Sequence, residues 1–239
     1  MRSSLFSAEN LEQESAQPGM RLQNSKMLKI ELNGEAMARV GSMVAYQGQV
    51  QFQALGSGGL GKFLKQKLTG EGVPLMKVSG QGDVFLAELA KDVHIIDLEP
   101  GDALSINGSS VLAFDSTLQY DIRMVGGTGM AASGLFNCVF SGHGRIAITT
   151  KGTPVVLNVD QPTYVDPQAA VCWSASLQTG YHRAEQLGLG TLLGRRTGEA
   201  FTMSFAGQGF VVVQPSEEPP VMGSGAQEQQ GGLLGGLLS

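Results

Sequence analysis

The chain has 239 residues, of which 42% are hydrophobic, only 15% are charged and 34 are glycine. The hydrophobic share excludes a disordered chain, and the net charge of −5 argues against a nucleic-acid partner, because such binding depends on a basic surface. Two cysteines are too few for a disulfide framework or a zinc cluster.

Residues 1–26 are predicted to form an N-terminal arm. The stretch 3–23 is mostly polar, which favours a loose segment; an edge strand or a short helix docked on the body is the alternative. The sequence shows neither the apolar core of a secretory signal nor the ~20 apolar residues of a membrane-spanning helix. We therefore expect a cytoplasmic protein with reduced thiols.

Two landmarks recur three times in the body of the chain. One is a Gly-x-Gly segment between apolar runs, and its glycines are Gly80, Gly82, Gly142, Gly144, Gly207 and Gly209. The other precedes it and consists of a small residue, an aromatic residue, three turn-like residues, an aliphatic residue and Gln. Its aromatic residues are Tyr46, Phe114 and Trp173. Two landmarks in a fixed order predict a threefold internal repeat.

The predicted repeats, 27–91, 92–151 and 153–214, form one β domain spanning residues 27–214. Each opens with a β-rich run followed by turn residues. The Gly-x-Gly segment is interpreted as the turn of a closing hairpin, because a tight link between strands favours positive φ. Short strands with regular turn signals predict an all-β sandwich or barrel-like body with very little helix.

The three aromatic residues occupy one position of the repeat. We interpret Tyr46, Phe114 and Trp173 as core residues that fill related layers of the body. A platform on which nucleic-acid bases stack is the alternative.

Glycine-rich connections, at 55–72, 125–134 and 187–200, separate the two landmarks. They are apolar and lightly basic, and the first places apolar residues at helical spacing. The candidate interaction residues in them are Leu60, Lys62, Phe63, Leu64, Leu189, Leu192 and Leu193. We expect these loops to support homo-oligomer formation, contact with an unknown protein partner, or peripheral contact with anionic lipid.

One loop also spells a phosphate-binding pattern. Residues 56–62 match G-x-x-x-x-G-K, but Phe63 stands where a P-loop needs the magnesium-binding hydroxyl. The chain also lacks the alternating helices and strands that such a loop requires. We therefore interpret this segment as a structural loop.

Histidine and cysteine residues give no catalytic or metal pattern. His94, His143 and His182 have no second ligand at the local spacings that metals use. Cys138 and Cys172 lie in apolar runs and are predicted to be inert core thiols. We assign no catalytic, cofactor-binding or metal-binding residue and expect no enzyme activity.

The tail, 215–239, changes composition. Prolines at its start would stop any strand, and it ends in four leucines among glycines. We expect a flexible segment that either docks in an apolar groove of a partner or sister subunit or has no role.

The segment 57–72, together with Val78–Ala87, resembles the altered-inheritance-of-mitochondria protein 24 family, and the resemblance extends over about 27–214. It implies a β fold similar to the tryptophan RNA-binding attenuation protein, with internal pseudo-threefold symmetry. It carries over no catalytic residue. Mitochondrial members are linked to inner-membrane organisation, and bacterial members are largely uncharacterised. The Gly/Leu-rich end and the few arginines before Met27 resemble a bacterial-type member.

Three functional hypotheses follow. The leading one is a non-enzymatic scaffold or interaction protein, with a membrane-peripheral role as a narrower version. The alternative is a small-ligand-binding β module or a cryptic enzyme with a pocket at the repeat axis. An RNA-binding ring is the third hypothesis, and the net negative charge disfavours it.

Overall fold

Antiparallel strands are the main secondary structure of the described residues. The fold is given by a computed structural model, which describes residues 3, 7–12, 18–55, 73–124, 136–183 and 201–216. Within these ranges the helical elements are two short 3-10 turns, η2 (Ala8–Asn10) and η3 (Gly108–Ser110). The all-β prediction with very little helix is confirmed.

The largest sheet has seven strands. They are β1 (Gly19–Asn24), β2 (Met27–Arg39), β3 (Met43–Ala54), β4 (Leu75–Leu86), β5 (Asp92–Leu98), β7 (Val111–Asp115) and β10 (Gly144–Thr150). Their order is β3-β4-β2-β7-β10-β5, and β1 pairs antiparallel with β2. Residues 19–24 of the predicted arm therefore form an edge strand.

Two smaller sheets complete the described fold. The six-stranded sheet, in the order β11-β16-β13-β6-β9-β8, contains β6 (Ala103–Asn107), β8 (Gln119–Met124), β9 (Phe136–Ser141), β11 (Val155–Val159), β13 (Ala170–Ser174) and β16 (Gly209–Val213). The three-stranded sheet, in the order β12-β15-β14, contains β12 (Thr163–Val165), β14 (Gln178–Arg183) and β15 (Phe201–Ala206).

The second and third predicted repeats pair their strands in the same way. In the second, β10 pairs with β5 and β7, and β9 pairs with β6 and β8. In the third, β16 pairs with β11 and β13, and β15 pairs with β12 and β14. The first repeat has three long strands, β2, β3 and β4, in place of six short ones. That all three are copies of one unit stays a prediction.

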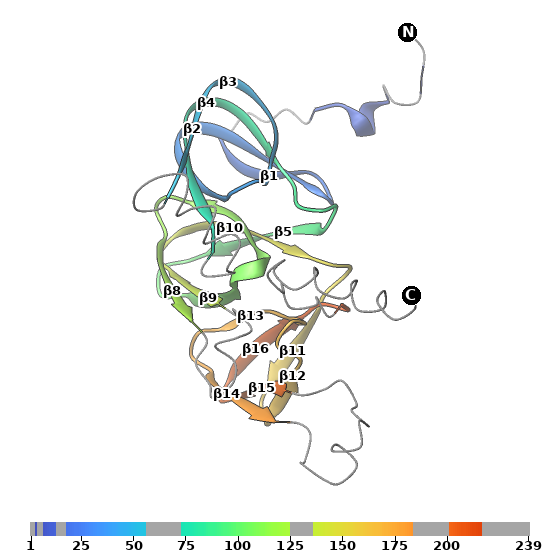
Figure 1. Ribbon diagram of the computed structural model, residues 1–239, viewed down its shortest axis with the longest axis vertical. Helices are drawn as coiled ribbons and strands as arrows, with labels where there is room; N and C mark the ends of the chain where they lie inside the picture. The colour runs from blue at the N-terminus through green and yellow to red at the C-terminus, as the bar shows by residue number, and fades with distance from the viewer. Residues whose placement is uncertain are drawn as a thin grey trace, which may run out of the picture.

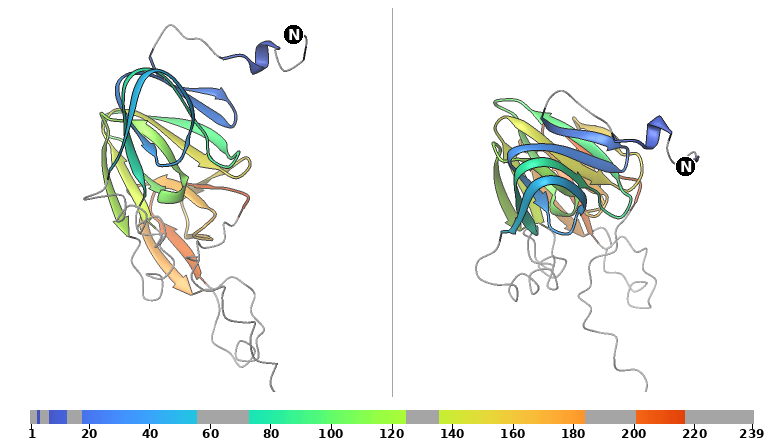
Figure 2. Two further views of the ribbon diagram at one scale, coloured as in Figure 1. Left: turned by 45° about the horizontal axis from the view of Figure 1, so that its top comes forward. Right: turned by 90° about the horizontal axis from the view of Figure 1, so that it is seen from above.

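The long strands β2, β3 and β4 arch over one end of the molecule (Figures 1 and 2). Glycines lie opposite one another on neighbouring strands of the arch, since Gly34 pairs with Gly80 and Gly48 pairs with Gly82. At Gly80, φ is +127° and an added Cβ would lie 2.0 Å from the carbonyl oxygen of Gln49. Only glycine fits this bend, where two backbones approach closely.

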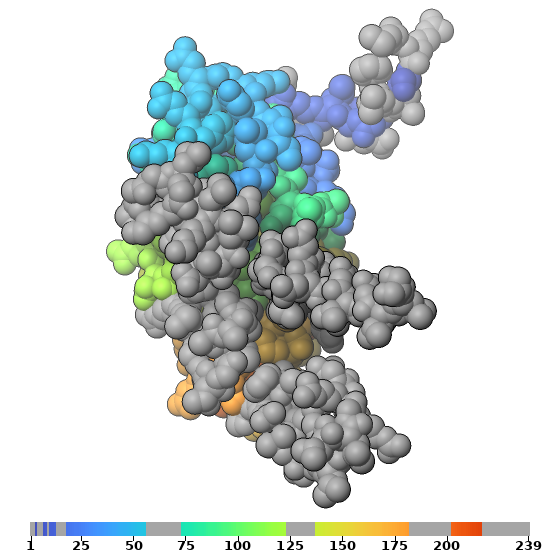
Figure 3. Space-filling model, viewed as in Figure 1, coloured from blue at the N-terminus to red at the C-terminus, as the bar shows by residue number. Residues whose placement is uncertain are grey.

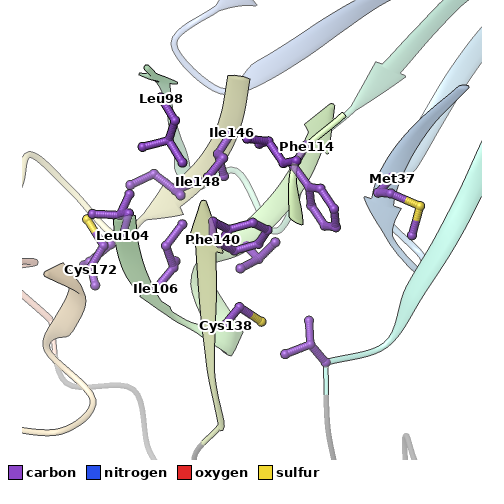
Figure 4. Packing of buried hydrophobic residues seen from close by; sticks show 14 of the residues in the cluster. Met37, Leu98, Leu104, Ile106, Phe114, Cys138, Phe140, Ile146, Ile148 and Cys172 are labelled. Atoms are coloured by element: carbon purple, nitrogen blue, oxygen red, sulfur yellow. The ribbon is translucent and has the colours of Figure 1, made fainter. Parts of the chain in front are cut away.

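The core consists of hydrophobic clusters stacked between layers of sheet. The middle cluster joins side chains of the seven-stranded and six-stranded sheets, including Phe114 and Phe140, whose ring centroids are 4.9 Å apart (Figure 4). The strand β7 is buried on both faces: Phe114 belongs to the middle cluster, whereas Ala113 belongs to a second cluster under the arch. A third cluster lies between the six-stranded and three-stranded sheets and includes Trp173. The arrangement is sandwich-like, with layers shared between neighbouring cores.

The two ends of the stack carry different strands. The arch, with β3, lies at one end of the long axis, and the three-stranded sheet, with β12, lies at the other (Figure 1). In the space-filling view, the light-blue atoms of the arch form the upper surface of the described part (Figure 3). No helix in the described ranges is long and apolar enough to span a membrane.

Candidate functional site

A buried lysine stands at the centre of a cluster of charged residues on the first sheet. The Lys29 side chain, on β2, is 2% exposed. Its Nζ donates to Glu12 and lies 3.2 Å from Oδ2 of Asp83 and 3.8 Å from Oε1 of Glu31. Arg21, on β1, donates to Glu31 in turn. The cluster therefore ties β1, β2 and β4 together and holds the residue Glu12 against the sheet.

The electrostatics of this cluster favour a structural role. Burial alone would lower the pKa of Lys29, but hydrogen bonds to Glu12 and Asp83 outweigh it, so this pKa lies above its ordinary value. The hydrogen bond from Lys29 lowers the pKa of Glu12. A lysine that acts as a nucleophile or base needs a lowered pKa. Lys29 is instead a permanent cation paired with carboxylates.

A second cation, the half-buried Arg39, anchors one end of β2 in the seven-stranded sheet. The Arg39 Nε donates to the carbonyl oxygen of Val111 at 2.8 Å, and its guanidinium also donates to the carbonyl of Gly108. The Glu88 carboxylate lies 3.6 Å from the same Nε. These contacts join the end of β2 to η3 and β7, which is a packing role.

The two thiols and His94 offer no reactive group. Burial raises the pKa of both Cys138 and Cys172 to about 12, so both are thiols at neutral pH. Burial also lowers the pKa of His94, whose Nε2 is 2.9 Å from the Thr150 hydroxyl. Among the described residues, no group of three or more His, Cys, Asp or Glu side chains is placed to hold a metal ion.

Exposed apolar side chains concentrate on free strands at the sheet edges. On β11, the edge of the six-stranded sheet, Val155 is 57% exposed and Val156 is 62% exposed. Successive residues of a strand point to opposite faces, so both faces of β11 are open. Tyr46 on β3 and Tyr164 on β12 are also about half exposed, and these strands are edges as well. The candidate functional site is this set of edges, β3, β11 and β12.

The hairpin interpretation of the Gly-x-Gly segments is wrong. Gly80 and Gly82 lie inside the continuous strand β4. Gly142 lies between β9 and β10, which belong to different sheets, and Gly144 is the first residue of β10. In the same way Gly207 lies between β15 and β16, and Gly209 is the first residue of β16. At Gly142, Gly144 and Gly207 a positive φ turns the chain through a corner between sheets, because the torsion angles that suit a hairpin also suit a sharp bend.

The landmark aromatic residues do not share one environment. Phe114 is fully buried and Trp173 is 3% exposed, where it packs edge-to-face on Phe205. Tyr46 is 49% exposed, so the interpretation as a core residue is wrong for this position. The physical reason is the position of its strand: among the described strands β3 is an edge paired with β4 alone, whereas β7 and β13 have a strand on each side.

The predicted interaction loops lie outside the described residues. This applies to Leu60, Lys62, Phe63, Leu64, Leu189, Leu192 and Leu193, and to the tail from residue 217. The described strands place the three connections alike: they join β3 to β4, β8 to β9 and β14 to β15, and each of these is an antiparallel pair.

Sequence reasoning did not single out Lys29, Tyr164 or the valines of β11. In the run 27–32 the alternation of apolar and charged residues places Lys29 and Glu31 on one face, which normally faces solvent. Glu12, which pairs with Lys29, belongs to a polar stretch whose sequence shows no periodicity that would predict this contact. Comparing the register of the repeats position by position would have located Tyr164.

These observations define the class of the protein: an all-β chain of stacked antiparallel sheets with apolar free edges. The family follows from comparison with known proteins, because the model of the family described as mitochondrial biogenesis AIM24 matches residues 20–216. The chain belongs to this family, which confirms the resemblance found in the sequence.

A solved structure shows the same fold. The crystal structure of a protein from Streptococcus pyogenes is similar, with a TM-score of 0.64 and 22% sequence identity over 83% of this chain and 92% of that chain. At this identity the similarity concerns the fold alone. No curated protein matches the chain.

Proposed function

We propose that the chain is a non-enzymatic scaffold, which binds a protein partner through the free edge of β11 and associates with its own copies. The observation that carries the proposal is the exposure of successive apolar residues on that edge, Val155, Val156 and Leu157. The charged groups inside the fold support a non-enzymatic role, because the buried Lys29 and the half-buried Arg39 are engaged in contacts that hold strands together.

An exposed edge strand suits partner binding by strand addition. Its unpaired N–H and C=O groups give main-chain hydrogen bonds to an added strand, and its side chains give selectivity. Natural proteins usually protect such edges with charges or proline. On β11 the first three residues, Val155–Leu157, are apolar and exposed, and both faces are open to a partner that covers them as it pairs.

The test compares partners of the tagged wild-type protein, a Val156→Lys variant and a Leu89→Lys variant, purified from the native cell and quantified by mass spectrometry. Leu89 is the matched control, because it is 87% exposed but lies in a turn rather than on an edge. We expect a partner protein that the Val156→Lys variant loses and the control retains. The same partners at the same levels on all three proteins would contradict the proposal.

Peripheral membrane contact is a narrower form of the same role. Its support is the chemistry of the loop that contains Lys62 and Phe63, where an apolar side chain adjoins a cation. Wild-type protein is expected to float with vesicles that contain anionic lipid, and a Phe63→Asp, Leu64→Asp variant is expected to stay behind. Absence of binding by both proteins would remove this form of the proposal.

A further inference from the structure

The chain contains two junctions in which a strand of one predicted repeat pairs with a strand of the next. At the first, β2 pairs with β7 and Met37 lies opposite Phe114. At the second, β6 pairs with β13 and Ser105 lies opposite Trp173. In both junctions the strand of the later repeat contributes its landmark aromatic residue, Phe114 or Trp173. The two junctions therefore have the same register.

A third pair of strands occupies the equivalent positions, but among the described strands these two do not pair. The third landmark aromatic residue is Tyr46, on the edge strand β3. The third counterpart of Met37 and Ser105 is Tyr164, on the edge strand β12, as the strand pairing shows. The cross-strand partners of these three residues are Lys77, Val139 and Ser204 respectively. Each partner stands three residues before the first glycine of its Gly-x-Gly segment.

The residues at the two paired junctions differ in burial from the residues at the unpaired third position. Met37, Phe114, Ser105 and Trp173 are all buried. The residues at the open positions are the exposed ones, with Tyr46 at 49% and Tyr164 at 58%. The exposure of Tyr46, which the repeat pattern alone does not explain, therefore follows from the absence of the strand that covers its equivalents.

We propose that a second copy of this chain supplies the missing strand. The strand β12 of one copy adds antiparallel to the first half of β3 in the next, with Tyr164 opposite Tyr46. The same register places Val165 opposite Ala45 and Thr163 opposite Gln47. The three-stranded sheet of one copy is thereby extended by strands of the next, as the strands of neighbouring repeats already extend one another within the chain.

The positions of β3 and β12 require that the strand pairing with each of them come from a second copy of the chain. The edges β3 and β12 belong to different sheets and lie at opposite ends of the long axis (Figure 1), so they do not pair within one chain. A facing pair of tyrosines adds aromatic contact to the main-chain hydrogen bonds. The interface is heterologous, so the assembly runs head to tail and gives a ring if it closes and a filament if it does not. This inference rests on the proposed self-association and specifies its strands and register.

Disulfide trapping tests the register. A Tyr46→Cys chain and a Tyr164→Cys chain carrying different tags are mixed and oxidised mildly; facing residues of antiparallel strands lie within disulfide range. We expect a disulfide-linked pair that contains both tags. A Leu89→Cys chain mixed with the Tyr164→Cys chain measures random collision and is expected to give none. Cys138 and Cys172 are buried thiols, and the wild-type protein controls for them.

Charge substitution tests the assembly itself, with mass measured by sedimentation across micromolar concentrations. A Tyr46→Lys, Tyr164→Lys chain is expected to be monomeric, whereas the Tyr46→Lys, Tyr164→Glu and Leu89→Lys chains retain the wild-type assembly. Circular dichroism verifies folding, which exposed positions should not disturb.

The outcomes separate this inference from the proposed function. A monomeric wild-type protein would overturn both the self-association and the inference. A wild-type assembly that the double-lysine chain preserves, or equal trapping by the Leu89→Cys control, would overturn the β3–β12 register while self-association stands. Partner binding at β11 is measured independently of either result.

Discussion

The side chain of Lys29 is buried, and its ammonium group lies among the carboxylates of Glu12, Asp83 and Glu31. Removing the buried cation leaves three half-buried carboxylates without their counter-charge, which costs more than breaking an exposed pair. We expect Lys29→Met to lower the free energy of unfolding by about 3 kcal/mol, measured in urea. The control is Lys77→Met, whose 2.8 Å pair with Glu35 is largely exposed, and its loss should stay below about 1 kcal/mol. Equal losses would contradict the buried-charge interpretation.

The pKa of Glu12 gives this cluster a pH dependence. Because the folded state lowers that pKa, mainly through the Lys29 hydrogen bond, the contribution of Glu12 is fully present above its unfolded pKa. It is lost as the pH falls through the folded pKa. The wild-type protein should therefore exceed the Glu12→Gln variant in unfolding free energy at neutral pH, and the difference should vanish in acid. A difference that persists unchanged in acid would rule out the ion pair as its source.

Among the elements, the arch of β2, β3 and β4 depends on glycines for different reasons at different positions. An added Cβ at Gly80 would lie 2.0 Å from a carbonyl oxygen, whereas at Gly34 it would meet nothing within 4 Å, although both have a φ of +127°. Gly34→Ala therefore costs backbone strain alone, about 1–2 kcal/mol. Gly80→Ala adds a clash between strands and should cost at least twice as much in urea unfolding. Equal costs would show that the strands separate freely at the bend.

The sequence predicted the strands better than their connections. The runs 27–32, 93–98 and 155–159 do begin or form strands, because β-branched and aliphatic residues fit a pleated surface. The Gly-x-Gly segments were assigned to hairpins, since positive φ serves a reversal and a corner equally well. Which of the two forms is decided by the pairing of distant strands, and no local signal reports it.

At the scale of the whole molecule, the middle layer packs against neighbours on both faces while the outer strands have one partner each. We expect amide hydrogen exchange, followed by mass spectrometry, to be slowest in β7 and β10. Exchange should be fastest in the edge strands β3 and β11, measured at a dilution where copies are separate. Uniform exchange across the chain would mean that it opens as one cooperative unit.

The candidate site is defined by which strands are left at the edges of the whole molecule, and this explains why the sequence predicted it poorly. The repeat pattern identified Tyr46 as equivalent to Phe114 and Trp173, and this equivalence is what makes its exposure informative. An internal repeat cannot say which copy stands at the end of a row. That information resides in the strand pairing, and the apolar loops that drew attention in the sequence lie outside the described residues.

The unlike ends of the molecule, with β3 at one and β12 at the other, have a genetic consequence. In the head-to-tail assembly proposed above, a chain damaged at one edge joins its normal sisters through the intact edge and then blocks the next addition. Alleles with lesions at Tyr46 or Tyr164 should therefore be dominant over the normal allele in the same cell, even at low dosage. Alleles that unfold the core, as at Phe114, remove the product altogether and should be recessive.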